Sequence, residues 1–476
     1  MLKPLALAAV TLPFIYGCSA PDDINPAEHI DTTAVENSSL TLHTTLTPAK
    51  WPSVNWWEKY QDPQLTSLIN QALENNPDMP LADARLRQAS AFIDQADAQF
   101  DPNVDLSASA RRSRMSRLED PSYQGNKFGT SRTLGIDASY TFDLWGGKKA
   151  AWQQSVDNFH AAEVEHQAAV VTLTSSIVGN YIQLSNAYAL EDLARKDLER
   201  SQRIEKITQQ LLNNGLTSDD KLYTAQSSVA AAQQTLKTRS LAIAQIKNAL
   251  SALMGLGPDV ADTIKRPSIT TDTTIVLPAN LPAQLLSHRP DIVAAKWRVE
   301  AADQSIAVAK TKFYPNFNLS AMAGFKSVLG DAMFEDVSES WNVTPAVSLP
   351  LFQSGLKANL RSTTANYDIA VAQYNKTLIQ ALNQVADNVL ILRSVEMQLE
   401  DAQRAMTLAE KSYHITETRY EAGMGSQLET LMAEQQLLNT ESMYTQLKNQ
   451  QQSTQISLIQ SLGGGFSTHT DEAEQQ

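Results

Sequence analysis

The chain has 476 residues and a formal net charge of −14, from 38 Lys and Arg against 52 Asp and Glu. This acidic balance argues against a nucleic acid as partner, because an acidic surface repels phosphates. Cys18 is the single cysteine, so the chain cannot form an internal disulfide.

The first residues predict export and lipid attachment. Lys3 precedes an apolar run over residues 5–16, and a glycine stands directly before Cys18. A short basic segment followed by such a run is typical of a signal peptide. A small residue before a unique cysteine resembles the lipobox of bacterial lipoproteins, although Tyr16 is unusual there. We expect a signal peptide at 1–17 and lipid on Cys18; the alternative is a plain secretory peptide with an incidental cysteine.

The sequence contains an internal duplication. Residues 76–110 resemble residues 289–323 at a single offset, and further matching landmarks follow in the same order. A repeat of about 210 residues is much longer than a solenoid unit, so a whole structural half has been duplicated. Each half is predicted to run helix, strand, strand, long helix, shorter helix.

Four segments alternate between apolar and polar residues, as strands with one apolar and one polar face do. Each is about ten residues long, which suits a tilted strand across a bilayer. Four strands cannot close a barrel and an open edge cannot lie in lipid, so three chains would have to pool twelve strands. The alternative is a small soluble sheet packed on helices. The segments are 103–112, 133–143, 316–325 and 341–351.

Two helical hairpins are predicted from apolar residues at 3–4 spacing in proline-free stretches. The expected helices are 152–213, 219–254, 357–421 and 427–462. A helix of about sixty residues is about 90 Å long, far beyond a globular helix, so these helices must pack along one another. Gly215 and Gly423 are expected to end the long helices, and Ser218 and Ser426 to cap the returning ones.

No catalytic constellation is evident, and the chain is not expected to be an enzyme. His160, Glu163 and His166 lie on one predicted helix, but their spacing fits neither metalloprotease motif. The sequence also lacks a nucleophile elbow and a phosphate-binding loop. We expect no metal and no cofactor other than the covalent lipid on Cys18.

With these elements placed, the chain resembles the TolC family of outer-membrane efflux ducts, in the lipoprotein branch of drug-efflux outer-membrane factors (OprM/NodT-like). The resemblance covers nearly the whole mature chain, and the order of the motifs is more specific than any one of them. The segments that carry it are 56–57, 62–65, 72–77, 289–291, 313–316, 420–423 and 462–466.

The resemblance implies an α+β membrane protein. Three protomers would form a twelve-stranded β-barrel, four strands per chain, continuous with a long α-helical periplasmic barrel. The first helices of the two repeats, 65–99 and 284–312, would lie in the barrel wall. The expected division is 1–17 signal peptide, 18–64 lipidated tether and equatorial segment, 65–254 first repeat, 255–283 inter-repeat equatorial segment, 284–462 second repeat and 463–476 C-terminal tail.

The function implied is that of a passive exit duct for drugs and other small toxic compounds in a tripartite efflux system. Its partners would be two further copies of itself, a periplasmic adaptor protein, an inner-membrane pump of the RND or major-facilitator type, and outer-membrane lipid. The chain would be lipid-anchored in the outer membrane, span it by its strands and extend into the periplasm. Two alternatives remain open: a duct for type I protein secretion, or a non-transporting structural envelope lipoprotein.

The resemblance also implies a gate and a docking surface. The family places an aromatic and acidic residues beside the second hairpin turn, which assigns Tyr420 and Glu429, with Arg419 and Glu417 as pairing partners. A second acidic position of some relatives is Met432 here. The alternative for each is an ordinary solvated helix face. The residues expected to contact the adaptor are Gly215, Leu216, Thr217 and Ser218 in the first turn, and Gly423, Met424, Gly425 and Ser426 in the second.

A dense basic cluster spans the end of the first predicted strand and the start of the connection predicted at 113–132. It consists of Arg111, Arg112, Arg114 and Arg117. The resemblance implies that these side chains lie in the first external loop. Because guanidinium groups bind phosphates well, we expect them to contact lipopolysaccharide phosphates. The alternative is a solvated basic loop.

Overall fold

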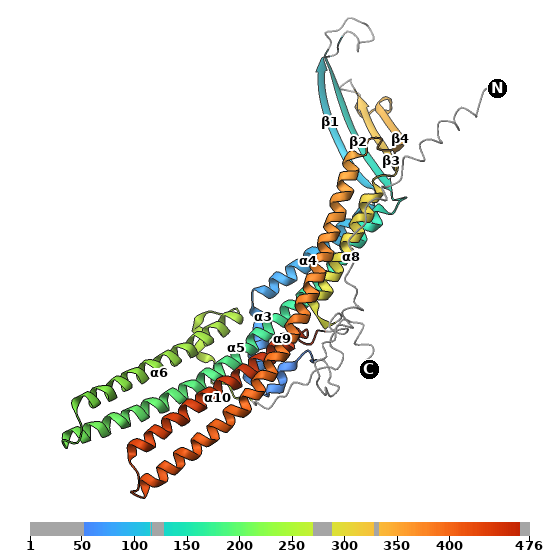
Figure 1. Cartoon of the computed structure of the whole chain (residues 1–476). Helices are drawn as coiled ribbons and strands as arrows, with labels where there is room; N and C mark the ends of the chain where they lie inside the picture. Colours follow the sequence, from blue (N-terminus) through green and yellow to red (C-terminus); the bar gives the residue numbers. More distant parts are fainter. Residues whose placement is uncertain (1–51, 115, 117–127, 270–287, 328–332, 467–476) are drawn as a thin grey trace. The chain divides into compact units, whose positions relative to one another are not determined.

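The computed structural model describes residues 52–114, 116, 128–269, 288–327 and 333–466 (Figure 1). The predicted signal peptide, Cys18 and Arg117 lie outside these residues. The described chain divides into two compact units. We call residues 86–162 and 295–374 the sheet unit, and residues 52–85, 163–269, 288–294 and 375–466 the hairpin unit.

The order of elements repeats, as the sequence predicts. The first half contains α3 (Pro63–Asn75), α4 (Asp78–Asp97), β1 (Asn103–Arg114), β2 (Phe128–Phe142), α5 (Gly147–Asn213) and α6 (Asp219–Leu253). The second half contains α8 (Pro290–Thr311), β3 (Asn316–Ser327), β4 (Glu339–Ser348), α9 (Ser354–Glu421) and α10 (Gln427–Ser461). Short 3-10 helices flank them, among them η1 (Trp56–Tyr60).

Two expectations need correction. The helix predicted over 65–99 is interrupted between α3 and α4, because Asn76 adopts an extended conformation before Pro77. The basic cluster is also not confined to a loop, because β1 continues to Arg114 and pairs with β2 from Phe128. Arg111, Arg112 and Arg114 are therefore strand residues.

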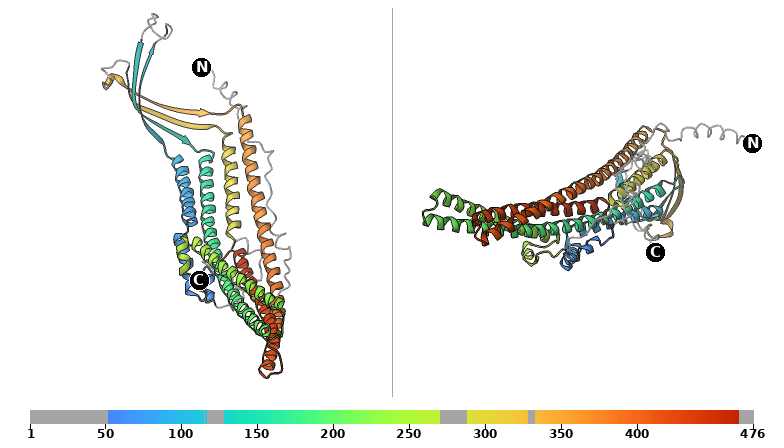
Figure 2. Two further views of the ribbon diagram at one scale, coloured as in Figure 1. Left: turned by 90° about the vertical axis from the view of Figure 1, so that its left-hand side faces the viewer. Right: turned by 60° about the horizontal axis from the view of Figure 1, so that its bottom comes forward.

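The sheet unit contains one antiparallel sheet with strand order β1-β2-β3-β4. α4, α8 and the first parts of α5 and α9 leave the sheet at the same end (Figure 2). Leu106 pairs with Ile136, Ile136 with Ala323, and Ala323 with Trp341. Since cross-strand partners share a face, the apolar residues of all four strands gather on one side.

This apolar side of the sheet is uncovered within the described chain. Leu106 is 75% exposed, Ile136 53% and Trp341 77%. A soluble sheet packed on helices would bury such residues, so that alternative is wrong for this chain.

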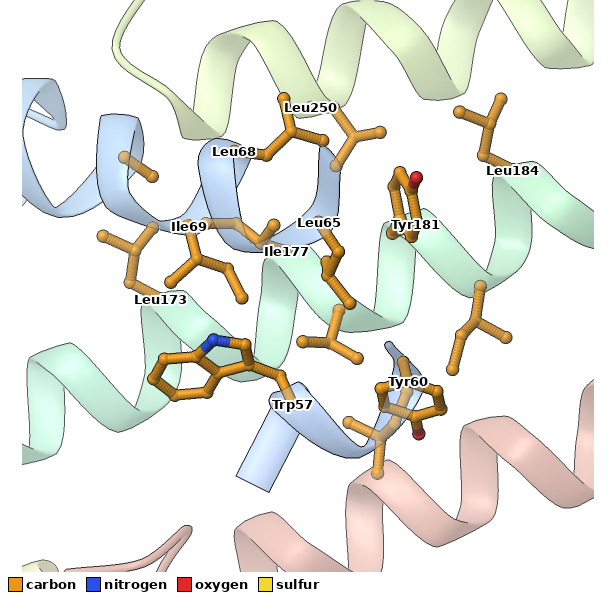
Figure 3. Packing of buried hydrophobic residues seen from close by; sticks show 14 of the residues in the cluster. Trp57, Tyr60, Leu65, Leu68, Ile69, Leu173, Ile177, Tyr181, Leu184 and Leu250 are labelled. Atoms are coloured by element: carbon orange, nitrogen blue, oxygen red, sulfur yellow. The ribbon is translucent and has the colours of Figure 1, made fainter. Parts of the chain in front are cut away.

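The hairpin unit has a continuous apolar core. Side chains of η1 and α3 pack against α5, and Leu250 of α6 closes the cluster (Figure 3). Trp56, Ile69 and Ile177 are fully buried or nearly so. The residues before α3 thus fix the position of α5, and they are the segment that the sequence analysis assigns to the equatorial region.

Asp62 ties the segment after α6 to this core. Its carboxylate accepts hydrogen bonds from the Tyr181 hydroxyl at 2.8 Å, the Ser268 N–H at 2.9 Å and the Gln64 N–H at 2.9 Å. Burial disfavours the charged form, but these hydrogen bonds outweigh it and hold the pKa of Asp62 below its usual value. A charged Asp62 therefore joins three segments that are far apart in sequence.

Equivalent positions of the two halves hold the ends of the shorter helices. Asn76 Nδ2 donates to the Leu253 carbonyl at 2.8 Å at the end of α6. Arg289, the repeat counterpart of Asn76, donates from Nη1 to the Ser461 carbonyl at 3.0 Å at the end of α10. Arg289 also forms a bidentate pair with Asp291. Each contact satisfies a carbonyl that the helix end leaves without a partner.

Three consecutive glycines close α10 in left-handed conformations. Gly463, Gly464 and Gly465 have φ of +98°, +61° and +85°. A Cβ atom on Gly463 would overlap the backbone oxygen of His288, so glycine is required there for both backbone conformation and space.

We expect Gly463→Ala to lower the free energy of unfolding by more than about 2 kcal/mol. Left-handed backbone alone costs an alanine about 1–2 kcal/mol, and the overlap with His288 adds to it. Thermal unfolding of the detergent-purified protein, followed by circular dichroism, measures the effect. Gly179→Ala in α5 is the control: a Cβ there meets nothing within 4 Å, and alanine favours helix by about 1 kcal/mol. Equal melting temperatures for the two variants would contradict the expectation.

Candidate functional site

The first candidate surface is the turn between α5 and α6. Gly215 has φ of +70° and its N–H donates to the Leu212 carbonyl at 2.9 Å. The Leu216 N–H donates to the Leu211 carbonyl at 2.8 Å. This pair of bonds is a Schellman motif, which ends α5 at the residue expected from the sequence. Leu216 projects from the turn and is 72% exposed.

The turn between α9 and α10 repeats this geometry. Gly423 has φ of +71° and donates to the Tyr420 carbonyl at 2.9 Å. The Met424 N–H donates to the Arg419 carbonyl at 2.8 Å, and Met424 is 68% exposed. Each protomer therefore carries two turns with one exposed apolar side chain in the same position. The turn residues predicted to meet an adaptor are accessible in this chain.

The helices after the two turns are capped differently. Ser426 accepts a hydrogen bond from the Glu429 N–H at 3.2 Å, and Glu429 accepts one from the Ser426 N–H at 3.4 Å, which completes a capping box. Ser218 is also the N-cap residue, but its hydroxyl donates to the Asp220 carboxylate and not to the helix backbone. The serines thus stand where the sequence predicts, and only one of them accepts a bond from its helix.

The four predicted gate residues all lie beside the second turn. Glu429 belongs to the capping box, and Arg419 Nη2 lies 3.5 Å from the Met424 carbonyl oxygen. Glu417 accepts a hydrogen bond from the Tyr413 hydroxyl at 2.9 Å, so Glu417 and Arg419 bind other groups within the protomer. Tyr420 is 41% exposed. Their contacts with other protomers stay a prediction.

Sequence reasoning missed a polar link between α5 and α10. Arg203 binds both carboxylate oxygens of Glu434, and Arg200 Nη1 lies 3.4 Å from the Leu431 carbonyl oxygen. Burial and the nearby carboxylates of Glu417 and Glu434 raise the pKa of Tyr413 to about 12, so its hydroxyl stays a donor. The partners of these two bonds between α5 and α10 are 231 residues apart, and no local pattern in the sequence brings them together.

The histidines on α5 have separate partners. His160 lies against the Trp297 ring, with centroids 4.7 Å apart. His166 Nε2 lies 2.9 Å from an Asp83 carboxylate oxygen. Within the described residues, no three His, Cys, Asp or Glu side chains are grouped as metal ligands would be.

The second candidate surface is the sheet, whose two faces differ in chemistry. One face, called the apolar face, carries Val104, Leu106, Ala108, Ala110, Leu134, Ile136, Ala138, Tyr140, Phe142, Phe317, Leu319, Ala321, Ala323, Phe325, Trp341, Val343, Pro345 and Val347. The other, called the polar face, carries Asp105, Ser107, Ser109, Thr133, Asp137, Ser139, Thr141, Asn318, Ser320, Asn342 and Thr344. Such a sheet suits a position between lipid and water.

A family model described as "Outer membrane efflux protein" matches residues 68–256 and residues 281–464, one stretch in each half. The chain belongs to the outer membrane efflux protein family.

Relatives of similar length agree with this family. The chain is 28% identical over 479 residues to the "Probable efflux pump outer membrane protein TtgC" of Pseudomonas putida, covering 100% of this chain and 98% of that protein. It is 28% identical to the "Probable outer membrane lipoprotein SilC" of Salmonella typhimurium, covering 98% and 100%. The crystal structure of the outer membrane protein VceC from Vibrio cholerae is 36% identical, with a TM-score of 0.80 over 88% of this chain and 100% of that one.

This outer membrane efflux protein is a passive channel component of the outer membrane and not an enzyme. It has the fold of the family's trimeric channels, in which the four strands of each protomer join those of the other copies. The apolar face meets lipid and the polar face lines the lumen, while the helices extend into the periplasm. None of the helices described is both long and apolar enough to cross a membrane.

We expect Arg203→Ala to make the channel easier to open, because it removes the ion pair with Glu434 and so weakens the link between α5 and α10 close to the second turn. Loss of a partly exposed ion pair corresponds to about 0.5–1 kcal/mol, or about a two- to fivefold rise in the open fraction. Single-channel recording in planar bilayers measures it.

The matched control is Arg404→Ala. Arg404 pairs with Asp401 on its own helix, so its removal breaks no link between helices. An open fraction that rises equally in both variants, or in neither, would exclude the α5–α10 link as part of the gate.

Proposed function

We propose that this channel is the exit duct of a tripartite efflux system for drugs and other small toxic compounds. It acts as a homotrimer with a periplasmic adaptor and an inner-membrane pump of the RND or major-facilitator type. The observation that carries this proposal is the sheet, with an exposed apolar face, a polar face and two unpaired edges. A polar lumen suits varied small cargo.

The two turns are the proposed adaptor surface. Leu216 and Met424 are exposed at matching positions, and both can be buried by a partner. Burial of such a side chain contributes about 1.5–3 kcal/mol to binding. The gate residues Tyr420, Glu429, Arg419 and Glu417 lie next to the second turn, so adaptor contact there is coupled to gate movement in this proposal.

We expect the double variant Leu216→Glu with Met424→Glu to lose most efflux while the purified channel still conducts. Each charge would have to be buried against the adaptor, which weakens binding by about tenfold or more. Efflux of a fluorescent dye from cells lacking the native gene measures transport, and planar-bilayer conductance is the control for an intact channel. Undiminished efflux at normal expression would contradict the adaptor surface.

We also propose that Cys18 carries the lipid anchor, since a glycine precedes this unique cysteine at the end of the apolar run. Cys18→Ser should remove the acyl mass from the N-terminal peptide of the membrane fraction in mass spectrometry. A peptide from the unaltered protein that begins elsewhere than Cys18, or lacks added mass, would rule lipidation out.

A further inference from the structure

Three arginines extend the apolar face of the sheet toward the outside of the cell. Arg112 and Arg114 continue the alternation of Leu106, Ala108 and Ala110 along β1, and so lie on the same face. Arg132 on β2 pairs with Ala110 and shares that face as well. The helices leave the opposite end of the sheet, so this end is the outer one (Figure 2).

A ring contact confirms the direction of the Arg112 side chain. Phe128 is the cross-strand partner of Arg114, and it is 64% exposed. The Arg112 guanidinium carbon lies 5.7 Å from the Phe128 ring centroid, the diagonal contact expected on one face.

The spacing along β2 places the arginines at headgroup depth. Phe142 lies at the helix end of the apolar face. Arg132 is ten positions away from it along β2. At about 3.3 Å per residue and a tilt of about 40°, these ten positions span about 25 Å, the height of the apolar band of an outer-membrane barrel. Arg112 and Arg114 pair with Thr130 and Phe128, two and four residues further out. All three guanidinium groups therefore lie at or just beyond the edge of the hydrocarbon.

The charge at this end of the face is not balanced by the described part of the protein. No carboxylate among the described residues forms an ion pair with any of the three arginines. Glu339 stands at the outer end of the same face on β4, opposite Phe325, and Glu335 and Asp336 precede it in the connection from β3. In the trimer, β4 of the neighbouring copy lies beside β1, so each protomer contributes three arginines and one glutamate to this end of the face. Three arginines against one glutamate leave a net positive charge at the lipid boundary, which is complementary to anionic headgroups.

We propose that Arg112, Arg114 and Arg132 of each protomer bind the phosphate groups of an anionic glycolipid of the outer leaflet, of the lipid A type. The guanidinium fork matches phosphate in a bidentate geometry, and the three groups follow one another along two paired strands. The occupant is a membrane lipid and not free phosphate, because the cluster continues a face that contacts acyl chains. Membership of the family does not by itself imply this site. The site follows from the identity of these three residues and from the register of β1 and β2.

The test is binding of bisphosphorylated lipid A to the purified trimer in uncharged detergent at about 0.15 M salt. Replacing all three residues, as Arg112→Gln, Arg114→Gln and Arg132→Gln, should raise the dissociation constant at least tenfold. Arg111→Gln is the matched control: Arg111 neighbours the cluster in sequence but pairs with Ser131 on the polar face, so its affinity should stay within about twofold. Equal affinity of the triple variant and the control would overturn the proposal.

Two measurements on the unaltered protein make the test independent of variant folding. Dephosphorylated lipid A should bind at least tenfold more weakly, and inorganic phosphate at millimolar concentration should not displace the phosphorylated lipid. If the dephosphorylated lipid binds equally well, the acyl chains account for the binding and the proposal fails. If inorganic phosphate displaces the lipid, the cluster is a free-anion site and the proposal also fails.

Discussion

The hydrogen-bonding groups at the edges of β1 and β4 impose the constraint from which the rest of the molecule follows. In lipid, every backbone N–H and C=O needs a partner from protein, and each unmet group costs several kcal/mol. A sheet of order β1-β2-β3-β4 leaves two edges open. Pairing β1 of one copy with β4 of the next removes both. Only in that assembly does the apolar face become the outer surface of a closed barrel and the polar face its inner surface.

The two halves have kept their backbone geometry while their side-chain chemistry has diverged. Both turns use a glycine with φ near +70° and the same pair of Schellman bonds. Asn76 and Arg289 make equivalent bonds to helix ends, but one is neutral and the other is charged and paired with Asp291. The backbone conformations at the glycines and helix ends are thus repeated in both halves, whereas the side chains that donate the hydrogen bonds differ.

Local features of the fold could be predicted from the sequence because they leave local patterns. The long helices end at Asn213 and Glu421, directly before turns whose glycines were expected to end them. The interruption before Pro77 has a local cause too, although the family resemblance led to the expectation of one helix over 65–99. The alternation of apolar and polar residues also predicts strands that are too short where β1 ends and β2 begins, because arginine and serine residues continue the strands beyond the apolar pattern.

The candidate site was less predictable, since it depends on contacts between distant segments. The pair of Arg203 and Glu434 joins residues 231 apart, and neither stands out in its own helix. Arg132 joins the arginine cluster through pairing with Ala110, which only the strand register shows. The placement of Tyr420 beside the second turn was available from the family resemblance. Its proposed role in the gate involves contacts with the other protomers.

The two turns of each protomer differ in their side chains, so the six turns of the assembled trimer are related by threefold and not by sixfold symmetry. Three protomers together carry six helical turns, three of each kind. At equivalent positions after the turns, one kind has Lys221 where the other has the capping-box residue Glu429. A partner that binds as six identical copies therefore meets two kinds of binding surface, with three copies on each kind.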